Sequence, residues 1–285
     1  MTPISFGDFP PQYKKRATSQ VALLPIAYDA TSTWKKGADK GPEALLAASQ
    51  ALEWFDRETE SEPFRVGIYT HEIIKDFSSP SFMVSTIKKK AQNILQEGKL
   101  YVGIGGEHSV SIGAIYAAAA IFNPLTVVQI DAHGDLRDRY HGSKYNHACV
   151  MARAAEVAET VQIGIRSFDR CEYNKMKLSK VFFAEDIYDN DLWIEKAVQS
   201  IPTSNVFLTI DLDGFDPSIL PATGTPEPGG LNWYGALKFF KKLFEEKNVI
   251  GFDVVELCPN ETSASSEFLA AKLVYKLIGY KFFIK

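Results

Sequence analysis

Short aliphatic runs alternate with longer helical segments along this chain, and that alternation constrains its fold more than any other feature. The runs that we predict as strands are residues 21–26, 65–69, 100–104, 125–130, 161–165, 180–183, 206–210 and 249–255. The segments that we predict as helices are residues 42–54, 81–96, 109–120, 147–158, 191–200, 233–246 and 264–278. Nearly continuous apolar strands are typical of a sheet covered on both faces, and strand–helix alternation favours parallel pairing through right-handed crossovers. The pattern predicts an α/β fold, a three-layer α/β/α sandwich with a mostly parallel sheet of about eight strands.

Composition and charge narrow the class of protein. No linker rich in proline, glycine or serine divides the 285 residues, so we predict a single domain over residues 1–285. The net charge of −4 and the lack of long Lys/Arg blocks give no reason to expect a nucleic acid partner. Neither a membrane span of ~18 apolar residues nor a signal peptide is recognisable, so we expect no membrane association. Three widely spaced cysteines argue against a disulfide framework, and we predict a cytoplasmic location.

Histidines and aspartates follow three of the predicted strands, directly where each strand ends. The residues in question are His108 after run 100–104, Asp131, His133 and Asp135 after run 125–130, and Asp211 and Asp213 after run 206–210. The carboxyl ends of parallel strands meet at one edge of a sheet, so we expect these six side chains to converge. If the chain stays extended past residue 130, its alternate acidic and histidine side chains share one face.

Each of these motifs has a structural explanation when taken alone. The Asp131 to Asp135 segment could be a polar strand exit, the Asp211 pair an acidic turn, and His108 a buried histidine bonded to backbone. Together they supply four carboxylates and two imidazoles without a cysteine, a ligand set that suits two Mn²⁺ or similar divalent ions. Clustered carboxylates without cations would repel one another, whereas two cations balance them and activate a water as a nucleophile.

Several longer segments extend this pattern. Residues 105–109 read Gly-Gly-Glu-His-Ser and residues 211–217 read Asp-Leu-Asp-Gly-Phe-Asp-Pro, while further matching segments are 25–42, 131–135, 222–231 and 253–259. In this order they resemble the ureohydrolase superfamily, which contains arginases and agmatinases, over about residues 20 to 280. The resemblance implies the arginase-like fold.

The resemblance also implies a reaction at two Mn²⁺ ions per subunit. His108, Asp131, Asp135 and Asp211 would hold one ion, and Asp131, His133, Asp211 and Asp213 the other. A water activated between them would attack a guanidinium carbon, with Asp135 accepting a hydrogen bond from it. Urea and a primary amine would then leave, and the amine needs a proton from a general acid.

Further roles follow from the matching positions. His147, in a segment that opens a predicted helix, matches the family's proton-shuttling histidine, and His141 is a competitor for that role. Glu256 matches a carboxylate that grips the guanidinium with two oxygens, and Thr225 resembles a pocket residue. Glu107, where many relatives carry aspartate, is expected to support the site through a hydrogen bond.

The identity of the guanidine is less constrained than the chemistry. The segment between Asp135 and His147 lacks the arginase pattern and resembles prokaryotic agmatinases, and Asp138 could face the cationic amine of agmatine. Arg137 or Arg139 would instead suit a carboxylate, so the charges alone leave this open. We predict hydrolysis of agmatine to putrescine and urea, a step of polyamine biosynthesis.

Other functions remain to be compared with this one. The same chemistry could act on aminopropylagmatine, guanidinobutyrate or arginine. A catalytically silent binding protein on this scaffold would have lost a ligand, and a single-zinc amide deacylase would show fewer ligands and a paired histidine motif; neither sign appears. The expected partner is a small guanidine, and the resemblance implies a homo-oligomer, a trimer or a hexamer.

Overall fold

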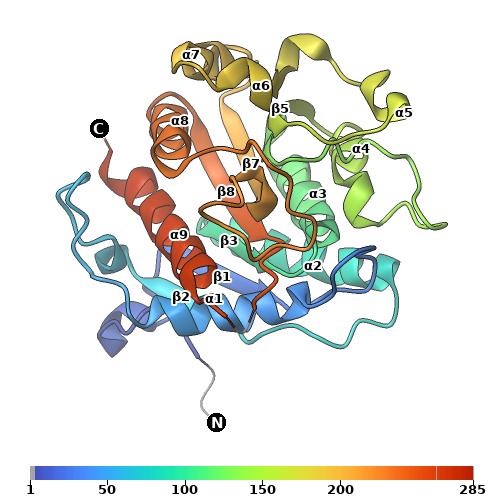
Figure 1. Ribbon diagram of the computed structural model, residues 1–285. Coiled ribbons are helices and arrows are strands. Elements are labelled where there is room, and N and C mark those ends of the chain that lie inside the picture. The colour runs from blue at the N-terminus through green and yellow to red at the C-terminus, as the bar shows by residue number, and fades with distance from the viewer. Residues whose placement is uncertain (1–3, 261, 285) are drawn as a thin grey trace.

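The strands form one sheet in the computed structural model, which describes residues 4–260 and 262–284 (Figure 1). Within those residues it is an eight-stranded, all-parallel sheet with the order β2-β1-β3-β8-β7-β4-β5-β6. The strands are β1 (Val21–Ile26), β2 (Ile68–Thr70), β3 (Leu100–Gly105), β4 (Leu125–Ile130), β5 (Glu159–Ile165), β6 (Val181–Phe183), β7 (Asn205–Asp211) and β8 (Asn248–Val255). The predicted parallel α/β architecture is confirmed.

Helices cover both faces of this sheet, as Figure 1 shows. One layer holds α1 (Gly41–Ser49), α7 (Leu192–Gln199), α8 (Trp233–Glu246) and α9 (Ser265–Phe283), and the other holds α2 (Pro80–Gln96), α3 (Ser111–Ile121) and α4 (Val150–Ala154). Short helices α5 (Arg170–Tyr173) and α6 (Ala184–Ile187) flank β6. Successive strand residues alternate between the two layers: Leu23 and Val102 pack in one hydrophobic cluster, and Leu24 and Tyr101 in the other. Burial on both faces explains why the strands are apolar throughout.

Several predicted bounds differ from the structure: the helix expected over residues 42–54 ends at Ser49, and the helix expected over 264–278 extends to Phe283. Two further elements differ more strongly. Residues 65–69 were expected as a strand, but Pro63–Val66 forms a 3-10 helix and β2 begins only at Ile68. Pro63 fixes the first turn of that helix, and Gly67, with φ of 78°, closes it next to Ser19. Residues 147–158 were expected as one helix, but a 3-10 turn precedes a short α4 that ends at Ala154, because the chain must reach β5 at Glu159.

The strand order brings four strand ends into one row. The strands β3, β8, β7 and β4 are consecutive neighbours in the sheet. Ile104, Val254, Ile210 and Ile130 are paired across them in register, so the residues that follow these four positions are level at the carboxyl edge. That edge is where parallel α/β sheets bind their ligands. In the described part of the chain, no helix is long and apolar enough to cross a membrane.

Candidate metal and substrate site

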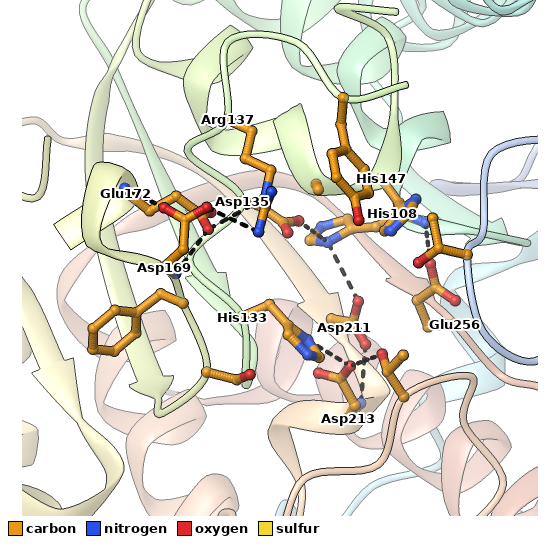
Figure 2. Close-up of a pocket in the computed structure, with 16 residues that line it drawn as sticks. His108, His133, Asp135, Arg137, His147, Asp169, Glu172, Asp211, Asp213 and Glu256 are labelled. Carbon is orange, nitrogen blue, oxygen red and sulfur yellow. Dashed lines mark hydrogen bonds and ion pairs between the residues drawn. The ribbon is translucent and has the colours of Figure 1, made fainter. Parts of the chain in front are cut away.

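A cavity of about 330 Å³ opens at this edge, over the ends of the four central strands (Figure 2). Five of the side chains expected there line it: His108, His133, Asp135, Asp211 and Asp213. The sixth, Asp131, is fully buried and contacts both histidines, as described below. The structure therefore brings the six residues together, as their strand-end positions predict.

The segment after β4 turns instead of staying extended, which corrects the expectation of a shared strand face. The backbone N–H of His133 donates to Asp131 Oδ1 at 2.6 Å, and Asp135 has a left-handed φ of 51°. The Asp135 carbonyl accepts from the backbone N–H groups of Met151 and Ala152, both at 3.1 Å. Asp135 thus reaches the site because α4 holds its backbone, and aspartate tolerates the left-handed conformation better than most residues.

Asp131 lies between the two histidines and presents one oxygen to each. Its Oδ2 is 3.1 Å from His108 Nδ1, and its Oδ1 is 3.5 Å from His133 Nδ1. His133 Nδ1 is also 3.0 Å from Asp213 Oδ2. A carboxylate with this placement could bridge two cations, one beside each imidazole.

His108 faces the remaining carboxylates. Its Nδ1 lies 3.0 Å from Asp135 Oδ2 and 3.3 Å from Asp211 Oδ2. Asp211 uses its other oxygen, Oδ1, to accept from the backbone N–H of Asp213 at 2.9 Å. Among the described residues, His108 Nδ1 is buried without a hydrogen bond of normal geometry, so one ring nitrogen and three carboxylate oxygens meet at one point.

The charge balance of the cluster indicates that cations belong there. Burial, and next the charge of Asp131, raise the pKa of Asp135 to about 7. Burial and the charges of Asp213 and Asp131 raise the pKa of Asp211 well above its usual value. Burial favours the neutral ring of His108, yet its contacts with these carboxylates raise its pKa strongly. The cluster thus gathers protons in place of cations, as expected of a site built for divalent ions.

Two ligand groups are close enough to bind metal ions. One consists of His108, Asp131 and Asp135, and the other of Asp131, His133 and Asp213, with the ligand atoms of each group within 4.8 Å of one another. Asp131 belongs to both groups. All donors are oxygen or imidazole nitrogen, so the residues present fit a pair of divalent ions.

Two residues behind His108 were given no role in the sequence analysis. His108 Nε2 is 3.0 Å from Thr209 Oγ1, and Thr209 Oγ1 donates to Asp253 Oδ1 at 2.7 Å. The Thr209 hydroxyl proton therefore goes to the carboxylate, so Nε2 carries a proton and Nδ1 keeps its lone pair for a metal. Thr209 and Asp253 are single polar residues inside apolar strands, and that signal could have identified them.

Replacing Thr209 by valine removes this hydroxyl and keeps the shape of the side chain. We expect the affinity for divalent metal to fall about 10- to 100-fold, because His108 loses the contact that orients its ring. Competition with a chelator measures this affinity. Thr126→Val is the matched control: Thr126 is a buried β4 threonine that contacts Thr203 at 2.8 Å, away from the cavity. Equal metal affinity in both variants would contradict the orienting role.

His147 lines the cavity, whereas His141 is exposed in a loop with φ of 46°. Asn146 begins the 3-10 turn that carries His147, its side chain accepting from the Ala148 N–H at 3.0 Å. Burial, helped by the charges of His133 and His108, lowers the pKa of His147 to about 4. Its ring is therefore neutral at neutral pH and can accept a proton.

Glu256 stands beside the candidate metal ligands, just after the end of β8. It has a left-handed φ of 64°, and its Oε1 accepts from the His108 backbone N–H at 2.6 Å. Burial and the nearby Glu107 raise the pKa of Glu256 well above its usual value. A cationic group in the cavity would relieve this cost, and a guanidinium is such a group.

Of the two other residues predicted to bind substrate, only one lies in the cavity. Thr225 lines the cavity, and its Oγ1 donates to Asp213 Oδ2 at 3.4 Å. Asp138 does not line it: its Oδ1 accepts from Arg153 Nη2 at 2.8 Å and its side chain is 72% exposed. The ion pair with α4 holds Asp138 away from the far end of any substrate bound in this cavity.

The end of the cavity opposite Glu256 is lined instead by three other charged residues, Arg137, Asp169 and Glu172 (Figure 2). Arg137 Nη2 is 3.0 Å from Asp169 Oδ2, Arg137 Nε is 3.4 Å from Glu172 Oε2, and the guanidinium lies 4.5 Å from the Tyr140 ring centroid. Asp169 and Glu172 also form the capping box of α5. In the sequence that pattern indicates only a helix start, which is why these two carboxylates were missed.

Comparisons with known proteins cover nearly the whole chain. The model of the family described as the arginase family matches residues 19–279. An N(1)-aminopropylagmatine ureohydrolase of Synechocystis sp. is 46% identical over 93% of this chain and 90% of that protein, and an agmatinase of Pyrococcus horikoshii is 33% identical over 90% of each. The crystal structure of an agmatine ureohydrolase of Thermoplasma volcanium superposes with a TM-score of 0.87 at 28% identity, covering 99% of this chain and 94% of that one. The matched segment contains every residue of the cavity.

Proposed function

Because this chain belongs to the arginase family as an agmatinase-type ureohydrolase, we propose that it releases urea from a guanidine with a cationic amine tail, at two Mn²⁺ ions. The observation that carries the proposal is the meeting of two histidines, four aspartates and Glu256 around one cavity. The family depends on two metal ions, and Mn²⁺ suits oxygen and imidazole donors.

The six converging residues are proposed as the metal ligands: His108, Asp131, His133, Asp135, Asp211 and Asp213. Asp131 would be shared by both ions, since its two oxygens face different histidines. The bound cations supply the positive charge that activates a water and stabilises the charge developing on the substrate. Asp135 would accept a hydrogen bond from that water.

The chain's own residues bind the substrate and move its proton. Glu256 has Oε2 free of the His108 contact and would bind the guanidinium, with Thr225 beside it. Water oxygen bonds to the guanidinium carbon, and the bond from that carbon to the substituted nitrogen breaks. The products are urea and an alkylammonium ion. The departing nitrogen carries one hydrogen in the guanidinium and three in the product, so both protons of the water must reach it. His147, neutral because of its lowered pKa, would accept one of these protons and deliver it.

We infer the chemistry of the substrate tail from the residues at the mouth of the cavity and from the substrates for which the relatives are named. Asp169, with a side chain 38% exposed, and Glu172 place two carboxylates at the far end against the single guanidinium of Arg137, so the net charge there is negative and would attract an ammonium group. Relatives named for aminopropylagmatine are 46% and 34% identical to this chain, against 33% for an agmatinase, although another relative named for aminopropylagmatine is 32% identical. We therefore favour N(1)-aminopropylagmatine over the agmatine that the sequence first indicated, with agmatine as the second candidate. The amine product would be a polyamine.

A screen of urea release over four guanidines tests this order. We expect kcat/KM for N(1)-aminopropylagmatine to exceed that for agmatine about tenfold, and that for arginine and guanidinobutyrate about 100-fold or more. The reason is that Asp169 and Glu172 outnumber Arg137, and their net negative charge would repel a carboxylate. A chelator should abolish all activity, and added Mn²⁺ should restore it. Faster hydrolysis of a carboxylated guanidine would refute the tail assignment, and no urea from any of the four would favour a silent binding protein.

We retain three further proposals about the whole protein: a single domain over residues 1–285, a cytoplasmic location and a homo-oligomer that is a trimer or a hexamer. Light scattering of the purified chain measures the last of these directly.

A further inference from the structure

Thr31, on the segment between β1 and α1, contacts His147 in two ways that the roles above do not explain. Its Oγ1 lies 3.4 Å from His147 Nδ1, and it also accepts from the His147 backbone N–H at 3.2 Å. One hydroxyl thus contacts both the backbone and the ring of the histidine proposed to move the proton.

Glu107 holds Thr31 in this place. The Glu107 side chain is fully buried, and Oε1 accepts from the hydroxyls of Thr31 and Ser109. Its Oε2 accepts from the backbone N–H groups of Thr31 and Ser32, the latter at 3.0 Å. Backbone and hydroxyl donors thus surround both oxygens, so the side chain is held on two sides and the Thr31 hydroxyl directs its proton to Oε1. Glu107 therefore fixes the position of Thr31 and the direction of its hydroxyl proton.

The direction of that proton determines which tautomer of His147 fits. The single Thr31 hydroxyl proton is donated to Glu107, so Thr31 Oγ1 offers only lone pairs to the histidine. A hydrogen bond from the ring to Thr31 then requires a proton on Nδ1. The other nitrogen, Nε2, is left with its lone pair to accept a proton in the cavity.

We propose that Glu107 and Thr31 are a positioning pair that fixes the orientation and tautomer of His147, so that Nε2 is the nitrogen that exchanges the proton. This inference rests on the proposed hydrolysis and adds two residues to it. Thr31 and Glu107 act through His147 and are not themselves expected to contact the substrate. The Glu107 of the strand-end motif thereby gains a role that does not involve the metal ligands.

The structure provides a selective variant. Thr31→Val removes the hydroxyl, while the backbone N–H groups of Thr31 and Ser32 still bond Glu107. Asp29 anchors the far end of the same segment through the Gly37 N–H at 2.6 Å. The loop should therefore stay in place, and Thr31→Ser should restore the contact. Ser32→Ala is the matched control, because Ser32 Oγ is 3.5 Å from Glu107 Oε2 and, among the described residues, forms no hydrogen bond with His147.

The kinetic test uses the Mn²⁺-loaded enzyme with the best substrate of the screen. We expect Thr31→Val to lower kcat roughly 10- to 100-fold, because His147 transfers the proton less efficiently. KM should stay within about twofold, because the residues that bind the substrate are unchanged. Thr31→Ser should recover most of kcat, and Ser32→Ala should match the unchanged protein. An unaltered kcat in Thr31→Val, or a Thr31→Ser variant as slow as Thr31→Val, would overturn the proposal.

A second measurement does not depend on turnover. The ¹⁵N resonances of the His147 ring, assigned with His147→Asn in Mn²⁺-free protein, report which nitrogen carries the proton. We expect a proton on Nδ1 in the unchanged chain and in Thr31→Ser, and loss of that preference in Thr31→Val. An Nδ1 proton retained in Thr31→Val would overturn the proposal even if no tested guanidine were hydrolysed, which separates its failure from failure of the proposed function.

Discussion

Replacing Asp131 by asparagine is expected to remove bound metal and to lower kcat/KM for urea release at least about 1000-fold. Asp131 is the carboxylate whose two oxygens face the two histidines, at 3.1 Å and 3.5 Å, and it belongs to both ligand groups. Asparagine keeps the shape but carries no charge and presents only one oxygen, so both proposed ions lose a ligand. Mass spectrometry of metal content and urea release measure the two effects.

The control for this variant is Asp39→Asn, which changes an exposed aspartate on the 3-10 turn Ala38–Lys40. It alters the net charge by the same amount and should keep both metal content and rate. If Asp131→Asn retained two metal ions per chain and turned over normally, the shared-ligand assignment would be wrong. Folding of the variant is checked separately by its thermal unfolding with and without Mn²⁺, because only a metal-binding protein should gain stability from the ion.

Replacing His147 by asparagine is expected to lower kcat about 100- to 10,000-fold while the metal content stays unchanged. His147 lines the cavity beside the proposed ligands, but its ring nitrogen Nδ1 is directed to Thr31 and belongs to neither ligand group. The variant therefore removes proton transfer and leaves the binding of metal and guanidinium in place. Steady-state kinetics should show the loss in kcat, with KM changed little.

His141→Asn is the matched variant, since His141 was the competing candidate in the sequence and lies exposed outside the cavity. We expect it to turn over at close to the normal rate. Loss of metal from His147→Asn would assign His147 as a ligand, and a larger effect in His141→Asn would exchange the roles of the two histidines.

Much of the fold and of the site was predictable because both depend on local patterns. Runs such as 21–26 and 125–130 match β1 and β4 residue for residue, since burial on both faces leaves a continuous apolar signature. His108, Asp131 and Asp211 were identifiable because each lies at or just beyond a strand end, and parallel strands share one carboxyl edge.

The residues that sequence analysis missed act through contacts with distant segments. Thr209 and Asp253 stand on neighbouring strands that are far apart in the chain, and their hydrogen bond exists only because β7 pairs with β8. Asp169 and Glu172 reach the cavity mouth through the packing of α5 and their ion pairs with Arg137. Asp138 is the opposite case: sequence analysis placed it at the substrate, but in the structure it pairs with Arg153 and lies outside the cavity.

The sequence by itself determined the order of strands and helices, the covered parallel sheet and the set of residues that end its strands. It did so because hydrophobic periodicity and strand-end polarity are local properties. The tertiary structure alone decided that β8 and β7 lie between β3 and β4, which places Glu256 and Asp211 between His108 and Asp131. It also decided that each oxygen of Asp131 faces a different histidine and that Thr31 faces His147. These arrangements follow from strand pairing and packing between distant segments, which no local pattern records.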